Sequence, residues 1–160
     1  MSVKLAAILA GAVVLSAHIG FAETTLGKEL AELTFAQIDA NSDQNADREE
    51  LKAMAASVFA SMDADASGSV SVAEFQAWDF GFVNIAEDAG KLEGFGTAQK
   101  IVFDLWERDN DQQLTLEEMK SAMEREVAYA DINSDGEVSK DEFLMGFSIN
   151  IAYRAAIKTE

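Results

Sequence analysis

The sequence contains no cysteine and no proline, and its only histidine is His18. The lack of cysteine excludes a disulfide framework, a thiol nucleophile and a lipid-anchored N-terminal cysteine. Because the rest of the chain also lacks histidine, it has neither the commonest catalytic base nor the usual ligands of transition metals. The composition therefore favours a binding protein over an enzyme.

Basic residues are also scarce. The chain has 12 lysine and arginine residues against 29 aspartate and glutamate residues, which gives a formal net charge of −17. This excess of one sign argues against binding to nucleic acid or to an anionic membrane surface. It also opposes the compact state through self-repulsion unless cations bind. Metal ions are therefore the first partners to consider.

The N-terminal residues have the pattern of a secretory signal peptide. Lys4 precedes an apolar stretch at residues 5–17, and small residues stand at the −3 and −1 positions of a cleavage site. A membrane anchor needs roughly 20 apolar residues, and His18 interrupts the run earlier. We therefore expect residues 1–22 to be removed. The remaining residues 23–160 would form a single domain in the bacterial periplasm or outside the cell, with no membrane span.

One segment near the C-terminus matches the pattern D-x-[DN]-x-[DN]-G-x5-E at every specified position. Calcium is a hard cation that takes six to eight oxygen ligands, and alternate residues of a tight turn can supply them together. The spacing recurs at residues 39–50, 63–74 and 107–118. An acidic surface loop can match once by chance, but 14 of the 29 acidic residues stand at ligand positions of these four segments. The specified residues of the complete match are Asp131, Asn133, Asp135, Gly136 and Glu142.

On these residues the chain resembles the EF-hand calcium-binding family, whose helix–loop–helix units usually occur in pairs. The resemblance implies an all-α fold of four EF-hand units in one compact domain, with short β-bridges between loops and Ca²⁺ as the bound ion. In such loops the side chains at positions 1, 3, 5 and 12 and the carbonyl at position 7 are the ligands, and the first loop has a carboxylate at position 9 as well. The implied metal-binding residues are Asp39, Asn41, Asp43, Asn45, Asp47 and Glu50 in the first loop (39–50); Asp63, Asp65, Ser67, Ser69 and Glu74 in the second (63–74); Glu107, Asp109, Asp111, Gln113 and Glu118 in the third (107–118); and Asp131, Asn133, Asp135, Glu137 and Glu142 in the fourth (131–142).

The four loops differ at position 6, where the chain needs a sharp turn with positive φ. Gly68 and Gly136 supply it in the second and fourth loops, whereas Gln44 and Gln112 stand there in the other two. A residue with a Cβ resists this conformation by about 1 kcal/mol. We therefore expect the second and fourth loops to bind more strongly. Asp47, at position 9 of the first loop, is either a fourth carboxylate that favours a trivalent ion or a solvated acid.

Only twelve residues separate the first loop from the second, and the third from the fourth. Twelve residues form about 18 Å of helix, which is too short for the two helices and the turn that usually separate paired loops. One helix must therefore leave one loop and enter the next, at residues 48–62 and again at 117–130. This layout is similar to that of lanmodulins, periplasmic EF-hand proteins that bind lanthanides, but position 2 lacks their proline. A lanthanide ion is thus an alternative to calcium.

The short linking helices also determine which loops pair. Backbone groups at positions 7–9 of each loop require a partner strand, and a helix of about 18 Å keeps sequence neighbours apart. A turn back within residues 75–96 would bring the second and third loops together and leave the first to pair with the fourth. We therefore predict Val70 opposite Leu114 and Ala46 opposite Val138, with the two linking helices antiparallel.

Apolar periodicity and glycine positions indicate the remaining elements. Entering helices are predicted at residues 29–38 and 97–106, and four glycines break a loop-rich bridge at residues 81–96. A single C-terminal helix is predicted at residues 143–157. Its predicted stripe consists of Phe143, Phe147, Ile151 and Ala155.

Two functions fit this sequence. The first is a periplasmic or secreted calcium-binding protein that acts as a buffer or as a calcium-stabilised binding module. The second is a calcium-dependent interaction protein, which would bind a periplasmic protein through an apolar groove lined by residues 75–82 and 149–157. Five methionines at helical spacing either fill the core or line such a groove. They are Met54, Met62, Met119, Met123 and Met145.

Overall fold

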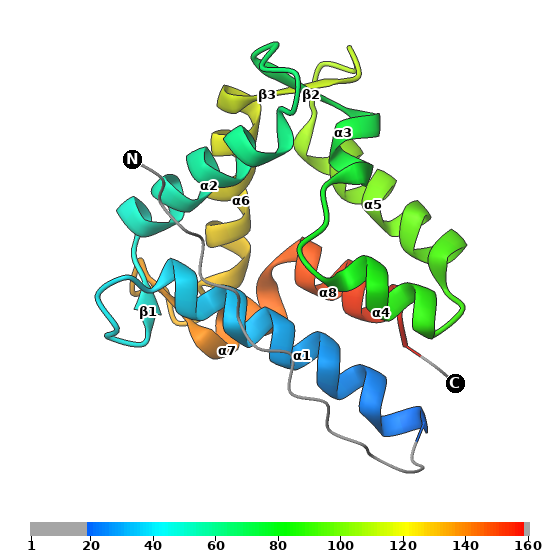
Figure 1. Ribbon diagram of the computed structural model, residues 1–160. Helices are drawn as coiled ribbons and strands as arrows, with labels where there is room; N and C mark the ends of the chain where they lie inside the picture. Colours follow the sequence, from blue (N-terminus) through cyan, green and yellow to red (C-terminus); the bar gives the residue numbers. More distant parts are fainter. Residues whose placement is uncertain (1–18, 159–160) are drawn as a thin grey trace, which may run out of the picture.

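Helices separated by tight loops make up most of residues 19–158, which are the residues that the computed structural model describes. The helices are α1 (Ile19–Ile38), α2 (Arg48–Met62), α3 (Val72–Ala77), α4 (Phe82–Asp88), α5 (Leu92–Trp106), α6 (Leu116–Ala130), α7 (Lys140–Gly146) and α8 (Ser148–Ala156). The strands are β1 (Asn45–Ala46), β2 (Ser69–Ser71), β3 (Gln113–Thr115) and β4 (Val138–Ser139). The predicted all-α architecture is confirmed: each acidic loop lies between two helices, and the strands are short bridges between loops (Figure 1).

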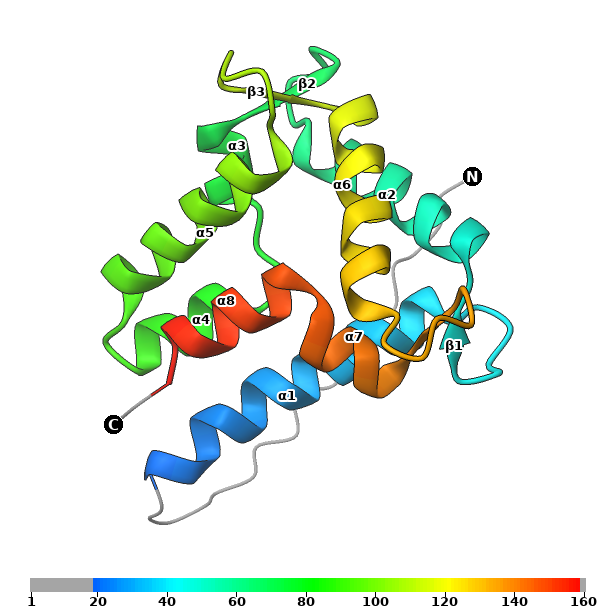
Figure 2. The same cartoon turned by 180° about the vertical axis from the view of Figure 1, so that it is seen from behind.

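The strands pair in the predicted way. β1 and β4 are antiparallel with Ala46 opposite Val138, and β2 and β3 are antiparallel with Val70 opposite Leu114. All four side chains are 0% exposed, so each strand pair closes the core beneath two loops. Since α2 joins the first two loops and α6 the last two, the four loops form a closed ring in which helices and strand pairs alternate (Figures 1 and 2).

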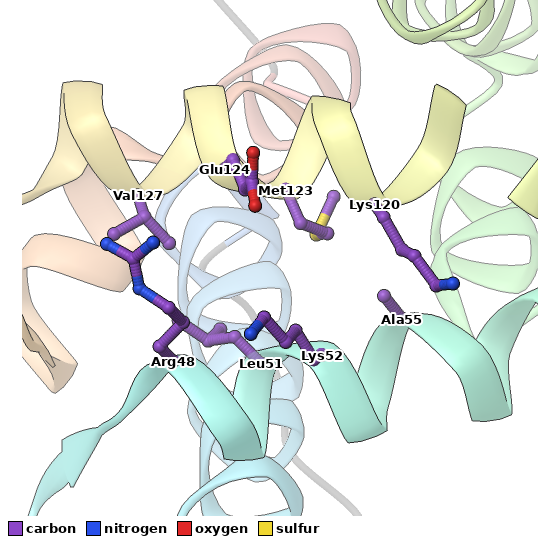
Figure 3. A pocket seen from close by; sticks show the side chains of 8 residues that line it. All are labelled: Arg48, Leu51, Lys52, Ala55, Lys120, Met123, Glu124 and Val127. Carbon is purple, nitrogen blue, oxygen red and sulfur yellow. The ribbon is translucent and has the colours of Figure 1, made fainter. Parts of the chain in front are cut away.

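The helices α2 and α6 are the predicted links between successive loops. Each begins directly after position 9 of one loop and ends at position 1 of the next, where Asp63 and Asp131 are the C-terminal caps. The two helices lie side by side, with Leu51, Ala55 and Met123 at their interface beside a small cavity of about 90 Å³ (Figure 3). One shared helix therefore connects each pair of sequence neighbours, as the twelve-residue spacing requires.

Aromatic side chains form the centre of the core. Phe75 packs edge-to-face against Phe103 and Trp106, with ring centroids 5.5 and 5.8 Å apart. Phe95 packs against Tyr153 at 4.8 Å, and all five rings are buried. Burial raises the pKa of the Tyr153 hydroxyl far above its usual value, because the phenolate form would lose its hydration. The hydroxyl is therefore neutral at any physiological pH.

The methionines serve both of the roles that the sequence left open. Met62, Met119 and Met123 are almost completely buried, whereas Met145 is 73% exposed. Met54 is partly buried and packs against the core. All except Met145 also line an apolar cavity. These four methionines therefore belong to the core and line the cavity at the same time.

The prediction of a loop-rich bridge at residues 81–96 is wrong, because helices occupy most of this segment. α4 lies within it, and α5 begins at Leu92, five residues earlier than predicted, so that Gly94 and Gly96 lie inside a helix. Each glycine costs a helix interior about 1 kcal/mol relative to alanine. Burial of Phe95 against Tyr153 contributes about 1.5–3 kcal/mol. This contact with a distant helix has no signature in the local sequence pattern.

The predicted single C-terminal helix is also wrong, because the chain breaks at Phe147. This residue is extended, with φ −72° and ψ 126°, and separates α7 from α8. The buried carboxylate of Glu126 holds the break, since it accepts hydrogen bonds from the Ser148 backbone N–H at 2.6 Å and from the Ser148 hydroxyl. α8 therefore turns a different face inward, and Ile151 and Ala155 of the predicted stripe are exposed.

The N-terminal helix extends beyond its predicted range. α1 begins at Ile19 and not at residue 29, and the predicted signal peptide (1–22) lies mostly outside the described residues. Gly27 allows close packing of α1, because a Cβ at this position would stand 2.9 Å from the Ile157 side chain. Within the described part of the chain, no helix combines the length and the apolar character needed to cross a membrane.

We predict that Gly146→Ala destabilises the protein, because Gly146 lies where α7 meets the end of α6. A Cβ at this position would stand 2.5 Å from Ala130 Cα and 2.6 Å from Ala130 Cβ. Such overpacking costs about 1–3 kcal/mol. The control is Gly94→Ala on α5, where a Cβ has no neighbour within 4 Å and should raise the free energy of unfolding by about 0.5–1 kcal/mol. Urea unfolding measures both variants, and equal stability would contradict this packing.

We expect Glu126→Ala to lower the free energy of unfolding by about 2–3 kcal/mol. The change leaves the Ser148 backbone N–H and the Trp106 indole N–H without their acceptor. Glu124→Ala removes the same charge from an exposed position on the same helix and should change stability by less than about 0.5 kcal/mol. If thermal unfolding finds the two variants equally stable, the break at Phe147 does not depend on the carboxylate.

Candidate metal centres

The carboxylate at position 1 of each loop organises the turn that follows it. In the second loop Asp63 accepts hydrogen bonds from the backbone N–H groups of Ser67 and Gly68, both at 2.9 Å. The position-3 side chain, Asp65, accepts from the Ser67 N–H as well, at 3.0 Å. The corresponding acceptors in the other loops are Asp39 and Asn41, Glu107 and Asp109, and Asp131 and Asn133. Every loop therefore folds around its first two predicted ligands.

The glutamate at position 12 joins the two ends of each loop. One carboxylate oxygen of Glu74 accepts a hydrogen bond from the Ala64 N–H at 3.1 Å, and the other accepts from the Ser71 N–H at 2.9 Å. The residues with the same pair of bonds in the other loops are Glu50, Glu118 and Glu142. Both oxygens are thus held at the loop, the arrangement that a bidentate calcium ligand requires.

Positions 5 and 7 are placed by the turn that leads into the strand. The carboxylates of Asp43, Asp111 and Asp135 each accept a hydrogen bond from the N–H at position 7, at 2.7–2.9 Å. In the second loop the position-5 hydroxyl of Ser67 accepts from the Ser69 N–H at 3.5 Å and also donates to the Ser69 carbonyl oxygen at 2.9 Å. The position-7 residues, whose carbonyls are the predicted ligands, are Asn45, Ser69, Gln113 and Glu137. Two candidate ligands of the second loop are therefore already in contact with each other.

Position 9 has a role that the sequence analysis missed. Asp47 is the N-cap of α2 and accepts hydrogen bonds from the Glu49 and Glu50 backbone N–H groups, both at 2.8 Å. The residues that cap the exit helix in the same way are Ser71, Thr115 and Ser139. All four form capping boxes with the glutamate at position 12, and the pattern [S/T/D]-x-x-E was a sufficient signal for this. Asp47 therefore stabilises a helix, which neither of its two predicted roles included.

The two glutamines at position 6 adopt the conformation that glycine adopts in the other loops. φ is 75° at Gln44 and 67° at Gln112, compared with 89° at Gly68 and 88° at Gly136. The four loops therefore follow one backbone course. The glutamines add local strain of about 1 kcal/mol, but the turn itself forms in all four loops.

Carboxylates converge in two of the loops. In each, three carboxylate groups bring oxygens to within 4.8 Å of one another. The two sets are Asp63, Asp65 and Glu74 in the second loop, and Glu107, Asp109 and Glu118 in the third. Negative charges this close repel one another, and a hard cation with oxygen ligands at about 2.3–2.6 Å would offset the repulsion. The third loop, which the sequence ranks among the weaker ones, assembles its carboxylates as the second does.

Hydrogen bonds lower the pKa of three of the four closing glutamates. The backbone N–H and the hydroxyl of Ser71 lower the pKa of Glu74, and the hydroxyl at position 9 lowers the pKa of Glu142 in the same way. Burial raises the pKa of Glu118, but hydrogen bonds from Thr115 and other loop groups outweigh it, so this pKa also lies below its usual value. These carboxylates are therefore charged at neutral pH and available to a cation.

A comparison with known families supports calcium binding of the EF-hand type. A family model described as EF hand matches residues 54–78 and 128–148. These two stretches contain the second and fourth loops, which have glycine at position 6. The first and third loops lie outside the matched stretches but share the backbone course of the other two. No curated protein and no solved structure matches the chain.

Gln44→Gly is expected to raise the free energy of unfolding by about 1 kcal/mol, because glycine adopts positive φ without strain from a Cβ. The reverse change, Gly68→Gln, should lower it by a similar amount. A Cβ at Gly68 meets no atom within 4 Å, so this variant tests backbone conformation alone. Urea unfolding in saturating calcium measures both, and effects of the same sign would contradict the argument.

Proposed function

We propose that this protein is a periplasmic or secreted calcium-binding protein with four EF-hand sites, which acts as a buffer or as a calcium-stabilised binding module and has no enzymatic activity. The observation that carries the proposal is the hydrogen-bonding scaffold repeated in four loops. It gathers like-charged carboxylates at the loops of a chain whose formal charge is −17. A bound cation is the natural compensation for such an arrangement.

Each loop can supply an ion with oxygens from one continuous turn. The side chains at positions 1, 3 and 5 and the carbonyl at position 7 follow one another, and the glutamate at position 12 closes the site from the exit helix. Calcium, when bound, supplies the positive charge. The residues of the chain contribute preorganisation: backbone N–H groups already hold the ligands, so that little conformational freedom is lost on binding.

A trivalent lanthanide is the alternative ion. The third loop offers four carboxylates for it, those of Glu107, Asp109, Asp111 and Glu118, and ligand charge is one factor that tunes ion affinity. Against a lanthanide, Asp47 is engaged as a helix cap and position 2 carries no proline. Calcium is therefore the ion we propose, and a competition titration between calcium and a lanthanide would distinguish the two.

A second function, calcium-dependent binding of another protein, is favoured by one observation. An apolar cavity lies between α1, α2, α6 and α8, and the two stretches predicted to line a groove contribute Trp78, Phe80 and Ile149 to it. In sensor EF-hand proteins, metal binding exposes a surface of this kind. A hydrophobic dye that binds only in the presence of calcium would support the sensor function, and equal dye binding with and without calcium would support the buffer.

Calorimetric titration with calcium tests the main proposal. We expect at least two ions per chain, and we expect Glu74→Gln or Glu142→Gln to lower the affinity more than Glu50→Gln or Glu118→Gln does. Each change removes the bidentate ligand at constant size, and strain at position 6 weakens the loops that the latter two residues close.

Glu93→Gln, in an exposed position on α5, is the charge-matched control for this titration and should leave the affinity unchanged. Fewer than two ions at saturation would refute the calcium-binding proposal. A larger loss from Glu50→Gln or Glu118→Gln would refute only the ranking of the loops.

A further inference from the structure

The cavity between α1, α2, α6 and α8 has a volume of about 270 Å³ and a mainly apolar lining. Among the described residues, no charged side chain lines it. The apolar residues that line it include Val58, Phe80 and Phe147. An engineered cavity of about 150 Å³ with a comparable lining stays dry and binds benzene. The space is therefore poorly suited to water and large enough for a molecule bigger than benzene.

The two helices that link the loops supply the adaptable part of this lining. Met54 and Met62 come from α2, and Met119 and Met123 come from α6. Unbranched thioether side chains fit irregular shapes at low cost. Leu33 of α1 also lines the cavity and is 63% exposed, so the cavity reaches the molecular surface beside it. The lining can therefore admit a ligand and adjust to its shape.

One buried polar group in this lining has an unused acceptor. Asn150 is 3% exposed, and its Nδ2 donates a hydrogen bond to the Phe143 carbonyl oxygen at 2.9 Å. Among residues 26–158, whose side chains the structure describes, no group donates to its Oδ1. The hydroxyl of Thr34, also in the lining, is satisfied because it donates to the Leu30 carbonyl oxygen at 3.0 Å. Since a buried acceptor without a donor is unfavourable, Oδ1 marks the point where a ligand N–H or O–H would bind.

We propose that this cavity binds a small, uncharged, mainly apolar molecule of about bicyclic size, whose single hydrogen-bond donor binds Asn150 Oδ1. The chain's formal charge of −17 disfavours an anionic ligand. A cation would find no carboxylate in the lining to compensate its lost hydration. A helix from another protein would fill the apolar space, but its backbone N–H groups are already engaged within the helix. None of the residues that line the cavity is a predicted calcium ligand, so the ligand would not compete with the ion for the same side chains.

The first test compares two probes that differ only in the donor. 2-Naphthol has one hydroxyl, and 2-methoxynaphthalene has the same ring system with no donor. Calorimetric titration of each into the calcium-saturated chain should give saturable one-to-one binding, with 2-naphthol binding at least about fivefold more tightly, the effect of one ordinary hydrogen bond.

The second test uses variants of the cavity. Val58→Trp fills the space from α2 and should abolish binding of both probes, whereas Ala56→Trp, on the exposed side of the same helix, should leave both affinities unchanged. Asn150→Leu should remove the preference for 2-naphthol and leave 2-methoxynaphthalene binding within about twofold. Circular dichroism confirms folding of each variant. If Asn150→Leu does not fold, the two probes on the natural sequence and the Val58→Trp variant decide the question.

Three results would overturn the proposal. The first is the absence of saturable binding of either probe, or binding that Val58→Trp does not reduce. The second is equal affinity for the two probes on the natural sequence, which would remove the role of Asn150. The third is failure of both probes combined with tight binding of a basic amphipathic helical peptide that Val58→Trp abolishes, which would assign the cavity to a protein partner.

Discussion

The shortness of the links between loops is the constraint on which this fold depends. Twelve residues permit one helix and not two, so the loops at the ends of α2 or α6 are held about 18 Å apart. The backbone groups of each loop therefore find their partner strand in the other half of the chain. An ion bound in the second loop would be coupled to the third through the Val70–Leu114 strand pair and to the first along α2.

Electrostatic repulsion acts against this packing. Asp39, Glu107 and Glu142 are carboxylates with 9% exposure or less. The ion pairs that the described residues form join neighbours along exposed helix faces, as in Lys52–Glu49 and Lys100–Asp104, and contribute little. The basic residues thus leave the loops uncompensated. Backbone N–H groups orient the loop carboxylates without neutralising them, so a cation that binds the folded loops would stabilise the fold.

The sequence was sufficient to predict those features of the fold that depend on the number of residues between loops. Spacing alone led to the shared helices, because twelve residues are too few for two helices and a turn. Spacing together with the expected turn back within residues 75–96 led to the pairing of Val70 with Leu114. The sequence was insufficient where contacts between distant side chains determine the structure. Phe95 packs on Tyr153, for example, and this contact stabilises α5 although the helix includes two glycines. The break before Ser148 has the same origin, because its acceptor lies on α6. The cap formed by Asp47 differs from these, since its capping box is a local pattern and was visible in the sequence.

The first half of the chain, with loops one and two, repeats the loop spacing of the second half, with loops three and four, but the two halves differ in their interior contacts. Three pairs of residues stand at the same distance in sequence from corresponding loops. They are Ile38 and Trp106, Val58 and Glu126, and Phe80 and Ser148. In the second half, hydrogen bonds to the Glu126 carboxylate join α5, α6 and α8. In the first half the three counterparts are apolar and line the cavity. Apolar contacts are non-directional and tolerate displacement, whereas a buried carboxylate with three donors does not. Any movement that an ion induces is therefore expected in α1, α2 and the segment after α3, around the cavity.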